Sequence, residues 1–298
     1  MITCKRPVIK NGHAFGCGQC MPCRIKHGRI WTHRIMLEAS QYKDNCFVTL
    51  TYDDEHLPED GSVNPEHMRF FLKLLRKKVH PLKIRYYGVG EYGDQTWRPH
   101  YHLVLFGFPT CQRGRTLQET NRVCCPTCSL VQRVWKRGHV LLDSVVPASA
   151  AYVCGYVAKK ATRQYSDNLG TRHPEFARMS LKPGIGYGLM HDVASAIMEH
   201  GLEESEDVPI HLRHGSKLWP LGNYLRKNLR RMIGRSEKTP ESVLKKMEEE
   251  LRPMREAAHL NAPPGSKEFA FRGAIMDANE GARINQLARF KRRKGKAL

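Results

Sequence analysis

Apolar and β-branched positions divide the middle of the chain into short strands and amphipathic helices. Residues 46–52, 83–90 and 100–108 combine alternating, aromatic and β-branched positions, which predicts three strands. Apolar residues that recur at three- and four-residue spacing after Pro65 predict a helix between the first two strands. The turn-rich segment 93–99 joins the second and third strands and favours a hairpin. The resulting order is strand, helix, strand, strand.

The same patterns extend to both sides of this core. They predict helices over 24–42, 130–136, 147–164 and 240–260 and a fourth strand over 139–142. Strands that follow one another and carry helices indicate the α+β class, with an antiparallel β-sheet flanked by helices. We expect three segments: a cysteine-rich helical segment (1–44), a core (45–190) with a cysteine-rich insertion at 109–129, and a basic, mostly helical C-terminal region with a tail (191–298).

The charge balance points to a polyanionic partner. The chain has 49 lysines and arginines against 29 acidic residues, which gives a net charge of +20. No apolar run approaches the roughly 18 residues that a membrane-spanning helix needs, so no membrane partner is expected. Cys4, Lys5 and Arg6 stand where a signal peptide would have its apolar segment. Nucleic acid is therefore the expected partner.

The cysteines are clustered along the chain. One cluster has the spacing C-x2-C-x2-C and a later one the spacing CC-x2-C. Clustered thiols in a chain without a secretion signal are typical of metal ligands, and Zn²⁺ is the expected ion. Two ligand sets remain open, because the first cluster can be completed by an upstream cysteine or by two thiols of the second cluster. The candidate ligands are Cys4, Cys17, Cys20, Cys23, Cys125 and Cys128.

Two histidines on the third strand form a candidate metal site. His100 and His102 are two residues apart, so their side chains share one face of the strand. Glu91 ends the preceding strand and reaches the same point if the two strands pair as neighbours. Two imidazoles and one carboxylate with open positions suit a divalent ion that also holds substrate.

The helix after Pro147 carries a candidate nucleophile. Tyr152 and Tyr156 are four residues apart and therefore project from one helical face. Lys159 and Lys160 follow Tyr156 at helical spacing, which places an ammonium group beside its ring. A nearby cation favours the phenolate, the more nucleophilic form of a tyrosine side chain.

The histidine pair, the preceding strand and the tyrosine helix, in this order, resemble the HUH endonucleases (histidine, hydrophobic residue, histidine). More closely, the chain is similar to the replication initiation proteins of the Microviridae, the small single-stranded DNA phages, and of their gokushovirus-like branch in particular. The resemblance covers most of the chain from Cys17 to about Arg231. It is carried by Cys17-Gly-Gln-Cys-Met-Pro-Cys-Arg24, Phe47-Val-Thr-Leu-Thr-Tyr-Asp53, Arg98-Pro-His-Tyr-His-Leu-Val-Leu-Phe-Gly107, the tyrosine pair with its lysine, and Lys182-Pro-Gly-Ile-Gly186.

The resemblance implies a ferredoxin-like HUH core and a metal-dependent DNA nickase. His100, His102 and Glu91 would hold Mg²⁺ or Mn²⁺ on the scissile phosphate of the origin. Tyr156 would attack this phosphate, forming a 5′-phosphotyrosine and a free 3′-OH primer. Tyr152 would serve a second transesterification, which releases and closes a genome-length circle.

The remaining site residues and the partners follow from the same resemblance. Lys159 would assist the tyrosine, and Lys160, Trp97 and Arg98 would contact single-stranded DNA at the replication origin. The chain has no G-x4-G-K-[ST] motif, so unwinding would fall to a host helicase and synthesis to a host polymerase, in the cytoplasm of a bacterial host cell.

Two other functions are compatible with the same sequence. A zinc-containing nucleic-acid-binding protein without catalytic activity would explain the charge and the cysteines. A transposase or plasmid relaxase of the HUH superfamily would explain the histidines and tyrosines, although plasmid relaxases tend to carry a third histidine, where this chain has Val104 after Leu103.

Overall fold

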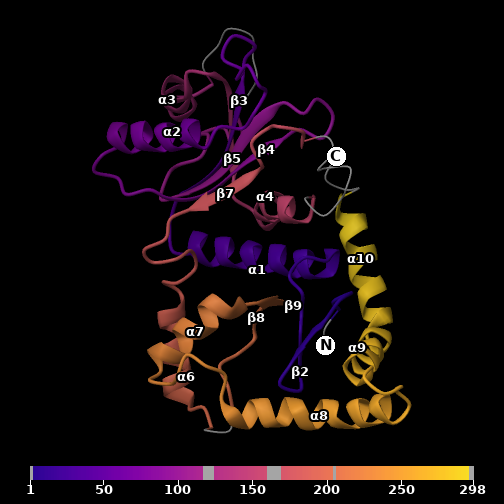
Figure 1. The fold of residues 1–298 in the computed structure, drawn as a ribbon. Coiled ribbons are helices and arrows are strands. Elements are labelled where there is room, and N and C mark those ends of the chain that lie inside the picture. Colours follow the sequence, from indigo (N-terminus) through magenta and orange to yellow (C-terminus); the bar gives the residue numbers. More distant parts are fainter. Residues whose placement is uncertain (1–2, 117–123, 160–168, 204–205, 295–298) are drawn as a thin grey trace. The chain divides into compact units, whose positions relative to one another are not determined.

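A computed structural model describes residues 3–116, 124–159, 169–203 and 206–294, except the side chains of residues 156–159 and 293–294. The chain divides into two compact units. The sheet unit comprises residues 31–156 and 162–191, and the terminal unit comprises residues 1–30, 157–161 and 192–298. Figure 1 shows the elements of both units, which are described separately below.

A five-stranded antiparallel sheet forms the centre of the sheet unit, with the strand order β6-β3-β5-β4-β7. The central pair, β3 and β5, aligns Thr49 with His102 and Thr51 with His100. The strands are β3 (Asn45–Tyr52), β4 (Arg85–Tyr92), β5 (Pro99–Phe106), β6 (Gly138–Ser144) and β7 (Phe176–Met179).

Helices α2 (Pro65–Lys78) and α3 (Pro126–Trp135) cover one face of this sheet, which we call the α2 face. The side chain of Asn64 caps α2 by accepting a hydrogen bond from the backbone N–H of Glu66, and Pro65 occupies the first turn, where its missing N–H has no cost. Four apolar residues at helical spacing turn toward the sheet: Met68, Phe71, Leu72 and Leu75.

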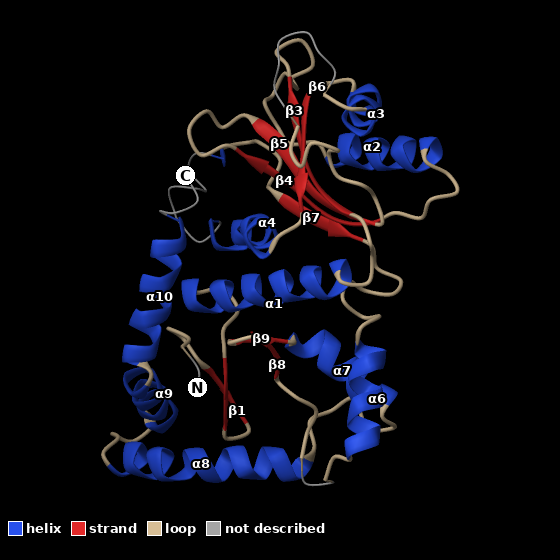
Figure 2. Cartoon of the chain, turned by 180° about the vertical axis from the view of Figure 1, so that it is seen from behind, coloured by secondary structure: helices blue, strands red, loops and turns tan. Residues whose placement is uncertain are grey.

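Helix α4 (Pro147–Lys159) and residues 31–39 of α1 (Met21–Ala39) cover the opposite, α4 face, as Figure 2 shows. Ile35 of α1 and Val153 of α4 are fully buried there against Val104 and Phe106 of β5. Because successive residues of a strand point to opposite faces, Tyr101, Leu103 and Leu105 pack on the α2 face, while the even-numbered residues of β5 face α4.

Tyr101 is fixed in the core by hydrogen bonds at its hydroxyl. The Tyr101 oxygen lies 2.6 Å from the hydroxyl of Tyr52, donates to the carbonyl of Asn64 at 3.0 Å and accepts from the N–H of Asn64 at 2.9 Å. The residue between the two histidines is therefore fully buried and held by the start of α2.

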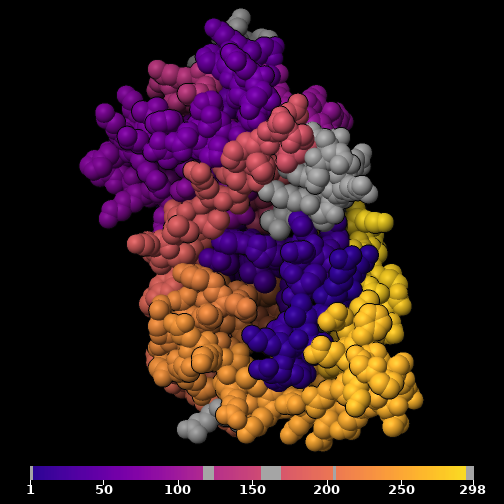
Figure 3. All heavy atoms as spheres, in the orientation of Figure 1, coloured from indigo at the N-terminus to yellow at the C-terminus, as the bar shows by residue number. Residues whose placement is uncertain are grey.

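The terminal unit combines two short hairpins with helices. Ala14 packs against Phe271 and Ile275 in a small apolar core, and Figure 3 shows the indigo N-terminal hairpin against the orange and yellow helices of this unit. Its elements are β1 (Val8–Lys10), β2 (His13–Phe15), α6 (Met190–His200), β8 (His211–His214), β9 (Lys217–Pro220), α7 (Gly222–Met232), α8 (Glu241–Leu260), α9 (Lys267–Ala278) and α10 (Glu280–Lys294).

The predicted α+β class, with an antiparallel sheet flanked by helices, is confirmed. The short strand β7 was not predicted. Helix α3 begins at Pro126, four residues before the predicted start, because Cys125 caps it and Pro126 fits its first turn. Residues 160–164 of the predicted fourth helix lie outside the described residues, and the three predicted segments remain a prediction.

The segment predicted as a peripheral insertion contributes to the core. Cys111, Cys125 and Cys128 are buried on the α2 face of the sheet, and Cys128 lies inside α3. Among the described residues, no helix is both long and apolar enough to cross a membrane.

Gly138, at the turn from α3 into β6, is expected to tolerate no side chain. Its φ is +134°, and a Cβ would lie 2.2 Å from the backbone nitrogen of Asp53. Gly138→Ala should lower the free energy of unfolding by about 3 kcal/mol or more, measured by urea denaturation. Gly114→Ala is the matched control, because Gly114 has a φ of +80° but no atom within 4 Å of a Cβ, so only the backbone strain of about 1 kcal/mol applies. Equal losses in the two variants would contradict the steric argument.

Candidate active site

The β4–β5 hairpin brings the predicted metal ligands together. Glu91 of β4 lies directly opposite His100 of β5, and His102 follows on the same face. One ligand atom from each of the three side chains lies within 4.8 Å of the others. The strand pairing on which the sequence argument depended is therefore present, and it places the three groups on the α4 face of the sheet.

The distances between the donor atoms suit a divalent cation. Glu91 Oε1 lies 2.6 Å from His100 Nε2 and 3.0 Å from His102 Nε2. Neighbouring ligands of an octahedral ion with bonds of about 2.1 Å are about 3.0 Å apart. The second carboxylate oxygen, Glu91 Oε2, is buried and has no hydrogen-bond partner within the part of the chain that the structure describes. A cation would satisfy it, so these residues fit a metal site.

Both imidazoles are oriented by hydrogen bonds at Nδ1. His100 Nδ1 lies 3.2 Å from the carbonyl oxygen of Arg98, which can only accept, so His100 carries its proton on Nδ1. His102 Nδ1 lies 2.9 Å from the hydroxyl of Thr49, on the neighbouring strand β3. With Nδ1 engaged in this way, Nε2 of each ring presents its lone pair toward Glu91, as a metal ligand requires.

Glu91 is ionised despite its burial. Its side chain is 1% exposed, and burial alone would raise the pKa of the carboxyl group. Hydrogen bonds from His100 and His102 outweigh this effect and hold the pKa of Glu91 below its ordinary value. At neutral pH the cluster therefore holds one negative charge among neutral imidazoles, which favours a cation.

Tyr152 lies beside this cluster. Its ring meets the edge of the His102 ring at a centroid distance of 5.2 Å, while Phe47 stacks on His102 at 5.5 Å. Tyr152 is 46% exposed, so its side chain reaches solvent. Partial burial, followed by the negative charges of Glu91 and Asp94, raises the pKa of Tyr152 to about 12. Its hydroxyl is therefore protonated at neutral pH.

The structure gives less information on the other residues of the tyrosine helix. Tyr156 and Lys159 belong to α4, but their side chains lie outside the described residues, as does the whole of Lys160. The helical backbone places Tyr156 one turn beyond Tyr152 on the same face.

Trp97 and Arg98 lie at the turn of the hairpin. Arg98 donates through Nε and Nη2 to the carbonyl of Tyr52, at 3.2 and 2.9 Å, and through Nη1 to Asp54 at 2.8 Å. Trp97 has a φ of +52° and stacks on Tyr92 at 5.7 Å. Arg98 thus ties the turn to the end of β3, and DNA contact by either residue stays a prediction.

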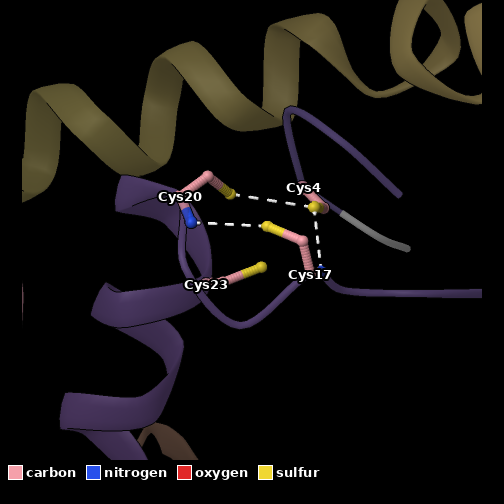
Figure 4. Close-up of side chains that lie close together, drawn as sticks. All are labelled: Cys4, Cys17, Cys20 and Cys23. Carbon is pink, nitrogen blue, oxygen red and sulfur yellow. Dashed lines mark hydrogen bonds between the residues drawn. The ribbon is translucent and has the colours of Figure 1, made fainter. Parts of the chain in front are cut away.

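The first cysteine cluster assembles at the N-terminus of α1, in the terminal unit. The sulfur atoms of Cys4, Cys17, Cys20 and Cys23 lie within 4.8 Å of one another, and those of Cys4 and Cys20 are 3.7 Å apart (Figure 4). The N–H of Cys17 donates to Cys4 Sγ at 3.2 Å, and the N–H of Cys20 donates to Cys17 Sγ at 3.3 Å. Burial would raise the pKa of Cys17, but the N–H groups of Cys20 and Gln19 outweigh it, and the pKa falls to about 6.

A second cluster lies in the sheet unit. Cys125 and Cys128 do not join the first cluster, because they stand at the start of α3 and pack into the core of the sheet. Their partners are Cys111 and Cys124, which the sequence analysis missed. The adjacent pair Cys124-Cys125 was a signal, but Cys111 lies thirteen positions before Cys124, too far for a spacing motif to reveal it. Of the two ligand sets left open, the structure assembles the one completed by Cys4.

Comparison with known proteins places this site in a family. Residues 45–161 match the family model of the replication-associated protein ORF2. This part of the chain belongs to that family of replication-associated proteins. The matched segment contains the hairpin with Glu91, His100 and His102 and the described part of α4. The predicted resemblance to phage replication proteins is thus confirmed.

Three curated proteins show the same relationship. The chain is 36% identical to replication-associated protein VP4 of Bdellovibrio phage phiMH2K over 49% of each chain. It is 34% identical to replication-associated protein ORF2 of Spiroplasma virus 4 over 57% of this chain and 56% of that protein, and 31% identical to replication-associated protein ORF4 of Chlamydia phage 1 over 48% and 38%. The chain therefore matches only about half the length of these relatives. No solved structure matches the chain.

Loss of the Thr49 hydroxyl is expected to weaken metal binding. Thr49→Val leaves His102 Nδ1 without its partner, so the ring loses its fixed orientation, and the Kd for Mn²⁺ should rise about 10- to 100-fold. Isothermal titration calorimetry on the purified chain would measure it.

Thr51→Val is the matched control for this experiment. It makes the same chemical change two residues along β3, opposite His100, whose Nδ1 is bound by the Arg98 carbonyl instead. An unchanged Kd in Thr49→Val, or an equal rise in both variants, would show that Thr49 does not orient His102.

Proposed function

We propose that the chain initiates replication by nicking single-stranded origin DNA through metal-dependent tyrosine transesterification. The observation that carries the proposal is the position of α4, whose Tyr152 ring lies 5.2 Å from that of His102. A candidate nucleophile and a candidate metal cluster thus lie side by side, although the sequence separates them by 50 residues. Membership of residues 45–161 in a family of replication-associated proteins supports the biological process.

Glu91, His100 and His102 would hold Mg²⁺ or Mn²⁺. One oxygen and two nitrogen donors with open positions suit either ion, and a bound ion would polarise the scissile phosphate and offset its negative charge. The fixed Nδ1 hydrogen bonds keep the two rings in place before DNA arrives. The exposed part of Tyr152 indicates the side from which a DNA strand would approach.

In the proposed nick, Tyr156 is the first nucleophile. Its phenolic oxygen forms a bond to phosphorus, the bond from phosphorus to O3′ breaks, and the departing oxygen takes up a proton to become the 3′-OH primer. The phenolic proton passes to solvent, and Lys159 would stabilise the charge that develops beside the ring. The product is a 5′-phosphotyrosine, and no phosphodiester energy is lost.

Tyr152 would act in the closing step. When the polymerase has copied one genome length, its hydroxyl would attack the regenerated junction, and the freed 3′-OH would then displace the first tyrosine and close the circle. Because each step exchanges one phosphodiester for another, no ATP is consumed. A host helicase and polymerase in the cytoplasm of a bacterial cell would supply unwinding and synthesis.

Contacts with DNA would depend on the charge of the chain. The net charge of +20 favours a nucleic-acid backbone, and Lys160, Trp97 and Arg98 are our candidates for contacts with the single strand near the nick.

We also propose that the first cysteine cluster binds Zn²⁺. Tetrahedral zinc with bonds of about 2.3 Å places its sulfur ligands about 3.8 Å apart, close to the 3.7 Å between Cys4 and Cys20. Backbone N–H groups directed at the sulfur atoms stabilise thiolates, the form in which cysteine binds zinc.

The proposed reaction is tested by trapping the covalent intermediate. The purified chain is incubated with an end-labelled single-stranded DNA library and Mn²⁺ and is then analysed on a denaturing gel. We expect a protein–DNA adduct that requires the metal, is lost in Glu91→Gln and in the double variant Tyr152→Phe/Tyr156→Phe, and persists in the control Tyr224→Phe, an exposed helical tyrosine of the terminal unit.

The single variants assign the order of the tyrosines. Loss of the adduct in Tyr156→Phe but not in Tyr152→Phe would support Tyr156 as the first nucleophile, and the reverse result would exchange the two roles. Tight DNA binding without an adduct under any metal would instead favour a nucleic-acid-binding protein without catalytic activity.

A further inference from the structure

The four cysteines Cys111, Cys124, Cys125 and Cys128 meet in the core of the sheet unit. Three of them are buried, with exposures of 7% or less, and they contact apolar neighbours on the α2 face of the sheet. All four sulfur atoms lie within 4.8 Å of one another, and all four are present as thiols. Cysteines alone would fill such a core no better than alanine or valine, so their convergence on one point calls for a ligand.

The spacing of the sulfur atoms suits a single tetrahedral ion. The sulfur of Cys111 lies 3.5 Å from that of Cys124 and 3.9 Å from that of Cys125, and the sulfur atoms of Cys125 and Cys128 are 3.4 Å apart. Four thiolates around one zinc ion are about 3.8 Å apart. A set of four soft sulfur ligands at this spacing selects zinc, whereas an iron–sulfur cluster needs thiolates that are farther apart.

The surroundings of the sulfur atoms favour thiolates. Cys125 stands at the N-terminus of α3, where the helix dipole is positive, and its sulfur accepts a hydrogen bond from the N–H of Cys128 at 3.5 Å. Burial would raise the pKa of Cys125, but the N–H groups of Cys128 and Gln112 outweigh it, and the pKa falls to about 7. The hydroxyl of Thr116 lies 3.1 Å from Cys128 Sγ.

We propose that Cys111, Cys124, Cys125 and Cys128 bind one structural Zn²⁺ ion in the core of the sheet unit. This site is separate from the N-terminal cluster, and it does not depend on the proposed nicking reaction. The ion would join the segment after β5 to the start of α3, which are otherwise connected through a long polar stretch of chain.

The site would secure the sheet on the side opposite the histidines. Thr116, the neighbour of Cys128, also exchanges hydrogen bonds with the backbone of Leu142 in β6. At the other end of α3, the indole N–H of Trp135 donates to the carbonyl of Thr51 in β3 at 3.1 Å. Anchoring both ends of α3 would therefore fix the strand that carries Thr49, the partner of His102.

The zinc content of defined variants tests the proposal. The full chain is purified under reducing conditions, and zinc per chain is measured by inductively coupled plasma mass spectrometry. We expect two zinc ions per chain in the wild type, one in Cys111→Ser/Cys125→Ser and one in Cys17→Ser/Cys20→Ser. Cys46→Ser is the matched control, because Cys46 is fully buried on the same face but outside both clusters, and it should keep two ions.

Two results would overturn the second site. One is an unchanged zinc content in Cys111→Ser/Cys125→Ser. The other is a disulfide among the four cysteines of the freshly purified wild type, detected as thiols that react with an alkylating reagent only after reduction.

A measurement on the wild type alone covers the case in which the double variant does not fold. X-ray absorption at the zinc edge should show an average of four sulfur ligands at about 2.3 Å for two ions per chain. A single ion per chain, or an average of clearly fewer than four sulfur ligands, would refute the proposal.

Discussion

A buried carboxylate is the constraint on which the site depends. Glu91 is 1% exposed, and an ionised carboxylate removed from water must be compensated by hydrogen bonds or by a cation. The two imidazoles of β5 supply part of this compensation, since both approach the same oxygen, Oε1. The other oxygen, Oε2, finds no partner among the described residues, and only a positive ion would complete the arrangement. The chain thus tolerates an electrostatic cost in its core that a purely structural hairpin would avoid.

The sheet separates two tasks by the alternation of its strands. On the α2 face, Tyr52, Tyr101 and Trp135 build a rigid aromatic core. On the α4 face, the same strands present the histidines, Glu91 and the hydroxyl of Thr49. A strand cannot move on one face without moving on the other, so the packing of the aromatic core also determines the positions of the ligand atoms.

Much of this arrangement was predictable from the sequence because it follows local rules. The apolar alternation of β3 and β5, the cap and apolar face of α2 and the two-residue spacing of His100 and His102 each have a short-range physical cause. The convergence of Glu91 was predictable only on the condition that the strands pair. Tertiary packing determined the rest.

Three features escaped the sequence for this reason. Strand β7 is four residues long and exists because an edge of β4 was available to pair with it. Cys111 joins its cluster across a long segment, which no spacing rule covers. The approach of Tyr152 to His102 depends on how α4 packs on the sheet, which helical periodicity alone does not fix.

The hydrogen bonds of the Tyr101 hydroxyl have a consequence for the hairpin. A shift of β5 by one residue would exchange the faces of all its side chains, placing Tyr101 in the site and the histidines in the core. The hydroxyl of Tyr101 prevents this shift, because it is bonded to Asn64 at the start of α2 as well as to Tyr52. The register of the histidines is therefore set from the far side of the sheet and not by the turn that joins β4 to β5. This turn is free to change in length and composition, so proteins built on the same sheet can vary it to suit different DNA while the ligand atoms stay in place.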